Sequence, residues 1–108
     1  MQILQINFKF SIARTDFEDT FTGVALIIAN IPGLHWQIWT IDESEQKAEW
    51  ICMFDNKSSV DAYLGKLMDG LDGNPSISDI CVKRSQVLNK LTKITRGFDG
   101  CQQIQSDI

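Results

Sequence analysis

The chain has 108 residues, 44% of them hydrophobic and 22% charged, which is typical of one globular domain and not of a disordered segment. Ten Lys and Arg residues against fourteen Asp and Glu residues give a formal net charge of −4 at pH 7. This balance argues against nucleic-acid and anionic-membrane partners, because both need a basic patch. The apolar runs are far shorter than the roughly 20 residues of a membrane-spanning helix, and the amino end lacks the pattern of a signal peptide. We therefore expect a cytoplasmic domain.

A strand and a helix are predicted at the start of the chain. Residues 2–10 alternate between apolar and polar side chains, and this period of two indicates a strand. Apolar residues then recur at helical spacing, and Thr15 followed by Glu18 has the spacing of a capping box. Pro32 and Gly33 should end this helix near residue 31.

The rest of the chain predicts three strands and a second helix. Residues 34–42 and 47–54 are rich in aromatic and β-branched residues, and the polar link between them indicates a hairpin. The second helix has one apolar stripe from Val60 to Leu71, with Ser58 and Asp61 as its predicted N-terminal cap. A fourth strand at residues 77–88 and a short amphipathic piece at 88–94 complete a domain that we place at 1–96. Residues 97–108 are predicted to be a polar tail.

The order β-α-β-β-α-β is that of the ferredoxin-like α+β fold. Both helices of this fold cover one face of a four-stranded antiparallel sheet, so the opposite face, called the open face below, stays uncovered. Strict alternation predicts that the open face carries Gln5, Asn7, Lys9, His35, Gln37, Trp39, Ile41, Ile51 and Met53. Several of these side chains are too apolar to face water, so we expect a homodimer joined through the sheet faces.

Large aromatic rings gather in the predicted hairpin and are candidates for a ligand pocket. Alternation predicts that Trp36 faces the helices together with Phe8, Trp50 and Tyr63, whereas Trp39 faces the other way. These rings either fill the core or leave an aromatic-walled pocket between sheet and helices for a small aromatic ligand. We favour Trp36 as a wall of that pocket.

Two polar residues in predicted strands are candidates for catalysis. His35 is the one histidine, the residue type that most readily exchanges a proton near neutral pH, so it is a candidate base or ligand anchor. The alternative is a hydrogen-bonded histidine at the dimer seam. Asn7 either faces water at an interface or presents its amide to a ligand.

Cofactor signals are missing from the sequence. Cys52, Cys81 and Cys101 are an odd number with no C-x-x-C spacing, and with His35 they match no zinc pattern. We interpret two of these cysteines as small hydrophobic strand residues and the third as a tail thiol. There is no Gly-rich phosphate loop, nucleophile elbow or Ser/His/Asp set. The sequence therefore predicts no metal site and no nucleotide-dependent enzyme.

Three segments of the chain carry a family resemblance. They are residues 3–10, the P-G-x-x-W-x-x-W-T stretch from Pro32 to Thr40, and Met53-Phe54-Asp55 leading into Ala62-Tyr63-Leu64. Together they make the chain, from about residue 2 to about residue 95, similar to the YdhR-type family of proposed monooxygenases. This family belongs to the dimeric α+β-barrel superfamily, alongside antibiotic-biosynthesis monooxygenases.

The resemblance implies a ferredoxin-like protomer, a dimer joined sheet to sheet, and oxygenation of an aromatic or polyphenolic compound without metal, flavin or haem. Trp36 and Trp39 match the family motif directly. Asn7 stands where the family's named member is expected to have His, and His35 occupies a variable position of the motif.

Haem degradation and non-catalytic ligand binding are the two alternative functions. A haem-degrading branch of the superfamily uses an Asn on the first strand, a Trp on the third and a His on the second helix. The second helix of this chain has no His, and Trp50 lies earlier in its strand than the Trp of that pattern. The main alternative is a non-catalytic or stress-associated barrel that binds a small hydrophobic ligand. A buried polar group in the pocket would favour the enzyme.

Overall fold

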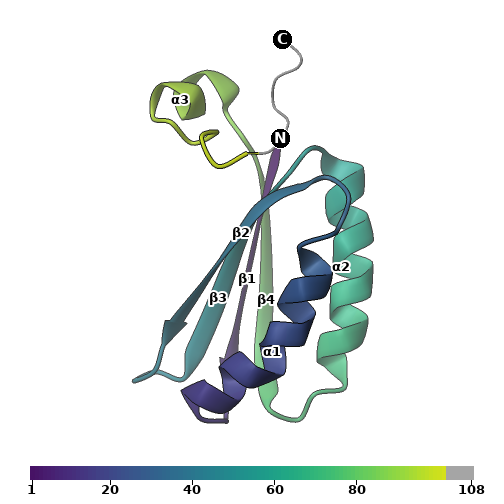
Figure 1. The fold of residues 1–108 in the computed structure, drawn as a ribbon, viewed down its shortest axis with the longest axis vertical. Coiled ribbons are helices and arrows are strands. Elements are labelled where there is room, and N and C mark those ends of the chain that lie inside the picture. Colours follow the sequence, from purple (N-terminus) through teal and green to yellow (C-terminus); the bar gives the residue numbers. More distant parts are fainter. Residues whose placement is uncertain (102–108) are drawn as a thin grey trace.

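The computed structural model describes residues 1–101, and these form a four-stranded antiparallel sheet with two long helices on one face (Figure 1). In chain order the elements are β1 Gln2–Phe10, α1 Arg14–Ile28, β2 Leu34–Asp42, β3 Lys47–Phe54, α2 Lys57–Asp72, β4 Ile77–Gln86 and α3 Asn89–Ile94. The strand order in the sheet is β2-β3-β1-β4. This confirms the predicted ferredoxin-like α+β protomer. Residues 102–108 of the predicted tail lie outside the described residues.

The core lies between the sheet and the two long helices. Leu4, Ile6, Phe8 and Phe10 of β1 are buried, whereas Asn7 and Lys9 are exposed, as the alternation of this strand predicts. Trp50, Cys52 and Phe54 of β3 share the buried face, because Ile6 pairs with Trp50 and Leu4 with Cys52. None of the helices within residues 1–101 combines the length and the hydropathy needed to cross a bilayer.

Strand β2 contains a bulge at its first residues. Leu34 pairs with Phe54 of β3, but the next pair joins Trp36 to Met53, so His35 is an extra residue between them. Side chains alternate along a strand, and one extra residue therefore moves every later side chain to the opposite face. The faces of β2 are decided at this single position.

The bulge overturns the predicted faces of β2. Gln37, Trp39 and Ile41 pair with Cys52, Trp50 and Ala48, and they face the helices. Trp36 and Ile38 pair with Met53 and Ile51 and lie on the open face. The predictions that Trp36 faces the helices and that Gln37, Trp39 and Ile41 face away are wrong. A prediction that assumes unbroken alternation from Leu34 onward cannot anticipate an inserted residue.

Both helices begin differently from the prediction. Helix α1 has Ala13 at its N-cap with no side-chain hydrogen bond, and Thr15 lies inside the first turn, so the capping box is wrong. Asn56 caps α2, with its Oδ1 accepting a hydrogen bond from the Ser59 backbone N–H at 2.9 Å. Ser58 lies inside the helix, because Asn56 is the last extended residue and α2 begins at Lys57.

Helix α3 lies on the other side of the sheet from α1 and α2, near one end of the open face (Figure 1). The segment that follows α3 also packs there. Cys101 Sγ lies 3.3 Å from Met53 Sδ, and a Cβ on Gly100 would lie 3.4 Å from Trp36 Cδ1. One end of the open face is therefore covered within the protomer.

The part of the open face formed by the edge strand β2 is not covered in this way. The side chain of Ile38 is 53% exposed, although it is a large apolar residue at the centre of a strand. Three apolar side chains on or beside α3 are exposed as well: Leu88, Leu91 and Ile94. This surface is apolar enough to suit another protein surface better than water.

Candidate functional site

An aromatic-walled cavity of about 300 Å³ opens between α1 and the edge strand β2. Phe17, Phe21, Trp39 and Ile41 form its apolar wall. The Trp39 ring centroid lies 5.9 Å from that of Phe21 and 4.7 Å from that of the buried Trp50. These rings offer flat apolar surfaces against which an aromatic ligand can pack.

A second cavity of about 270 Å³ lies between α1 and α2. Its lining is mostly apolar and includes Ile28, Leu67 and the ring of Tyr63. Phe21 lines both cavities.

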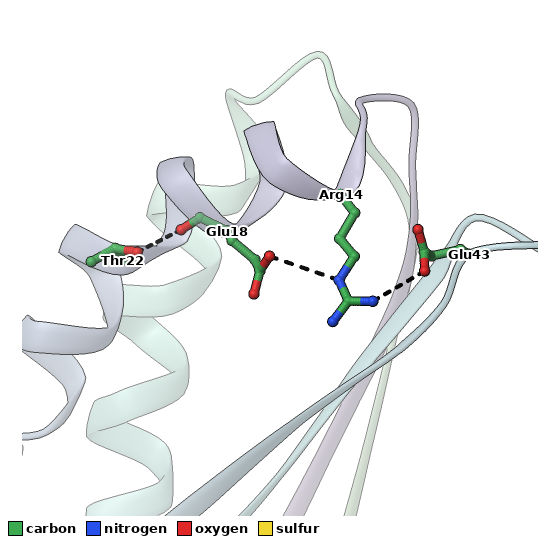
Figure 2. A network of polar contacts seen from close by, with 4 residues as sticks. All are labelled: Arg14, Glu18, Thr22 and Glu43. Carbon is green, nitrogen blue, oxygen red and sulfur yellow. Dashed lines mark hydrogen bonds and ion pairs between the residues drawn. The ribbon is translucent and has the colours of Figure 1, made fainter.

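The mouth of the aromatic cavity is polar. Arg14 lies between two carboxylates: Nη1 is 3.1 Å from Glu43 Oε2, and Nε is 3.7 Å from Glu18 Oε1 (Figure 2). The Thr22 hydroxyl donates to the Glu18 backbone carbonyl at 2.6 Å. Arg14 thereby connects the first turn of α1 to the β2–β3 hairpin. All three charged side chains are more than half exposed, so each pair contributes little to stability.

A cluster of polar groups lies beneath the cavities, at the interface of the sheet and α2. Gln37 Oε1 accepts hydrogen bonds from the Tyr63 hydroxyl at 3.1 Å and from the Cys52 thiol at 3.0 Å. Gln37 Nε2 and Trp50 Nε1 are buried, and neither makes a hydrogen bond within the described part of the chain. The cluster thus contains more donors than acceptors.

Burial keeps the two ionisable members of this cluster protonated. It raises the pKa of the Cys52 thiol to about 12, and it raises the pKa of Tyr63 well above the ordinary value of a phenol. The side chains of Gln37 and Trp50 lower the Tyr63 pKa, but the opposing effect of burial is larger. At neutral pH both groups act as hydrogen-bond donors and not as bases.

Four of the predicted ligand-binding residues lie on the helix side of the sheet. Trp39 lines the aromatic cavity, and Tyr63 lines the cavity between the helices. Phe8 and Trp50 are buried below them, with ring centroids 5.3 Å apart. Trp36 is on the open face and lines neither of these cavities.

The two predicted catalytic residues lie away from the aromatic cavity. Asn7 is exposed on the open face, opposite Glu49 on one neighbouring strand and Cys81 on the other. His35 is buried in the β2 bulge, where its Nε2 meets the Asp55 carboxylate. Their catalytic roles stay predictions.

Sequence reasoning missed Gln37 and Cys52 as members of the site. Alternation assigned Gln37 to the open face, and no local signal marks the bulge that turns it inward. Cys52 was interpreted as a small hydrophobic strand residue, and only its pairing opposite Gln37 brings its thiol to the amide. The helical stripe of α1 did carry a signal for Phe17 and Phe21, which face the sheet as their spacing indicates.

The family model described as "Putative mono-oxygenase ydhR" matches residues 3–98. The chain belongs to the YdhR family. No curated protein is a significant match to its sequence.

Solved structures of low sequence identity share the fold of this YdhR-family chain. SnoaB, a cofactor-independent oxygenase from Streptomyces nogalater, has a TM-score of 0.65 and 14% identity, over 81% of this chain and 93% of that chain. A protein from Deinococcus radiodurans described as a "putative antibiotic biosynthesis monooxygenase" has a TM-score of 0.64 and 15% identity, over 81% and 92%. The heme-degrader MhuD from Mycobacterium tuberculosis has a TM-score of 0.61 and 16% identity, over 80% and 95%. The likeness to these proteins is one of fold.

Proposed function

We propose that this protein is a cofactor-independent monooxygenase that acts on a small aromatic or polyphenolic compound bound between the sheet and the helices. The observation that carries the proposal is the buried donor cluster of Gln37, Trp50, Cys52 and Tyr63 beside an aromatic-walled cavity. Membership of the YdhR family and the description of SnoaB as a cofactor-independent oxygenase support it.

The chemistry requires little of the protein beyond binding. An anthrone-type substrate loses one proton from its CH₂ group, and the resulting enolate gives one electron to O₂. The substrate radical and superoxide then join through a C–O bond and take up a proton to give a hydroperoxide. Cleavage of the O–O bond with loss of the second C–H proton gives a ketone and water. In total, one CH₂ and one O₂ become one C=O and one H₂O, and the substrate supplies all the electrons.

The residues of the site would act on the charge that forms on the substrate. Buried hydrogen-bond donors stabilise an oxyanion more than water-exposed donors do, because they are already oriented and the local dielectric is low. Trp39 and Phe21 would hold the flat ring and exclude water. Because Tyr63 and Cys52 keep their protons, the rate should rise with pH through the pKa of the substrate itself.

Oxygen uptake with anthrone tests the proposal. We expect purified protein, dialysed against EDTA, to consume O₂ above the protein-free rate and to form anthraquinone in equal amount. Trp39→Ala should lose most of this activity, whereas Leu26→Ala, a change at an exposed residue of α1, should keep it. Saturable binding of several anthrones and quinols without O₂ uptake would support the non-catalytic ligand-binding alternative. Activity that disappears with EDTA would contradict cofactor independence.

The proposal includes a homodimer joined through the open sheet faces. The exposed Ile38 beside Ile51, together with the exposed apolar residues near α3, forms a surface that a second copy would cover. Such a dimer leaves both cavities on the outer, helix-covered side of each sheet.

A further inference from the structure

We propose that the cavity between α1 and α2 is a second binding site, which takes a free medium-chain carboxylate. The alkyl chain would lie in the groove between the two helices, and the carboxylate would lie at Lys66. The inference does not rest on the proposed function, and its ligand belongs to a different chemical class from the aromatic substrate.

The first observation is that this cavity has an apolar floor and an exposed rim. Its floor includes Ile28, Leu67 and Leu71, which belong to the core and are at most 8% exposed. Ile27, which also lines the cavity, is 71% exposed. A cavity of about 270 Å³ that reaches solvent and has aliphatic walls suits an apolar small molecule.

The second observation is that the cavity follows the two helices. Helices α1 and α2 run in opposite directions along the same face of the sheet (Figure 1). The lining extends from Thr20 to Ile31 on one side and from Tyr63 to Asn74 on the other. From Thr20 to Ile28, α1 rises about 12 Å, which is the length of an extended chain of about ten carbons. A linear chain therefore fits this groove better than a fused ring does.

The third observation is a glycine that leaves the groove unfilled. Gly70 lies within α2 and lines the cavity, and a Cβ placed on it would meet no atom of another described element within 4 Å. Glycine inside a helix is less favourable than alanine, because it loses more backbone entropy on folding. Packing within the described residues does not require a glycine here, and its missing side chain leaves room for a ligand.

The fourth observation is a cation at the rim of the groove. Of the residues that line the cavity, Lys66 alone is charged, and it forms no ion pair with any side chain that the structure describes. Its flexible stem can lie along the apolar rim while the ammonium group stays in water. An ammonium group favours an anionic headgroup over a neutral or cationic one. An aliphatic groove beside a single cation therefore fits an alkyl chain that ends in a carboxylate.

The size of the cavity argues against a protein segment as the occupant. A stable protein interface buries about 800 Å² on each partner. A groove of about 270 Å³ is the size of a small-molecule site and offers much less surface than that.

Isothermal titration calorimetry with carboxylates of increasing length tests the site. Below their micellar concentrations, hexanoate, octanoate and decanoate should each bind as one molecule per chain. The affinity should rise about fourfold for each added CH₂ group, because each group leaves water. Dodecanoate should bind no more than about twofold more tightly than decanoate, because the groove ends. Decylammonium should bind more weakly than decanoate, because its charge repels Lys66.

Two glycine variants of α2 form a matched pair. Gly70→Met fills the groove, whereas Gly65→Met makes the same change at a helical glycine outside the lining of this cavity. Methionine is a better helix former than glycine, so both variants should fold, which thermal unfolding checks. Gly70→Met should bind decanoate about tenfold more weakly or worse, and Gly65→Met should bind it as the wild-type protein does.

Two lysine variants test the headgroup. Lys66→Gln should weaken decanoate binding about threefold and leave 1-decanol binding unchanged. Lys57→Gln, in the first turn of the same helix, should change neither. If Gly70→Met is not folded, this pair of variants decides.

The outcomes are distinct. Decanoate affinity that is unchanged in folded Gly70→Met, or affinity that keeps rising steeply beyond decanoate, would overturn the assignment, because the chain would then not occupy this groove. A wild-type dimer that becomes a monomer in Gly70→Met would also overturn it, because the groove would then be a contact between copies. Affinity that levels off near decanoate and is lost in Gly70→Met but not in Gly65→Met would support it, whatever the result with anthrone.

Discussion

Trp36 and Trp39 belong to the same strand but have different surroundings. Trp39 packs between Phe21 and Trp50 on the helix side, whereas Trp36 lies on the open face beside Met53 and Gly100. The first ring contributes to the core and to the cavity wall of the protomer. The second contributes to a surface that we propose to be a dimer interface.

Alanine at each position should separate these contributions. Trp39→Ala should lower the free energy of unfolding by about 3 kcal/mol, near the bottom of the usual range for a large core ring because one side already lines a cavity. Trp36→Ala should act mainly on association, so its effect should depend on protein concentration. Urea denaturation at several protein concentrations measures both. An equal, concentration-independent loss in the two variants would contradict the different roles.

The buried Cys52 thiol should lower the free energy of unfolding at alkaline pH. Burial raises its pKa in the folded protein to about 12, so between the ordinary thiol pKa and that value only the unfolded chain loses the proton. The stabilising effect is complete below the ordinary thiol pKa, and it is lost as pH rises toward the folded pKa, at about 1.4 kcal/mol per pH unit per group. Tyr63 acts in the same direction at higher pH.

The thiol contribution can be isolated with Cys52→Ala. Urea denaturation between pH 8 and 11 should show a shallower decline of the unfolding free energy in this variant than in the wild-type protein. Cys81→Ala, at an exposed cysteine on β4, is the matched control and should keep the wild-type slope. Identical slopes in the wild-type and Cys52→Ala proteins would refute the assignment.

At the scale of the elements, loops and bulges decide how each strand and helix is used. The left-handed Gly33, with φ of 87°, leads into β2, and a Cβ there would lie 2.3 Å from Ser59 Oγ. The bulge at His35 follows directly and sets the faces of the whole strand. Ser59, which lies next to Gly33, is also the residue whose backbone N–H is capped by Asn56 at the start of α2.

Alanine substitutions distinguish the observed cap of α2 from the predicted one. Asn56→Ala should cost about 1 kcal/mol of unfolding free energy, because it removes the acceptor for a first-turn N–H. Ser58→Ala should be nearly neutral, because Ser58 is an exposed helical residue. Thermal unfolding followed by circular dichroism is sufficient. A larger loss of unfolding free energy for Ser58→Ala than for Asn56→Ala would instead support the predicted cap at Ser58.

At the scale of the whole molecule, the two faces of the sheet have different roles. The helix side contains the aromatic cavity and the donor cluster, and the open side carries Ile38, Ile51 and Trp36. A dimer through the open faces would cover apolar surface without blocking the cavities. Obligate interfaces of this kind bury upward of about 2,000 Å² in total.

Light scattering should give twice the chain mass of 12.2 kDa at micromolar concentration. Ile38→Glu places a charge on the exposed apolar part of the open face and should give the monomer mass. Leu26→Glu adds the same charge at an exposed apolar position of α1, on the opposite side of the protein, and should remain dimeric. A wild-type mass of one chain would disprove the dimer.

The sequence by itself determined the order of the elements, the buried face of β1 and the aromatic stripe of α1. Each of these rests on a periodicity within one segment, and local burial against a single core is enough to enforce it. The resemblance to the YdhR family was likewise carried by short motifs, and residues 3–98 match that family.

Only the tertiary structure decided which way β2 turns its side chains. The bulge at His35 is defined by hydrogen-bonded pairing with β3, a contact between distant residues that no local period contains. The same pairing brings Gln37 to Cys52 and Tyr63, and so it creates the donor cluster on which the proposed function depends. Alternation predicts that two neighbours face apart, but the partner strand determines which of them faces the core.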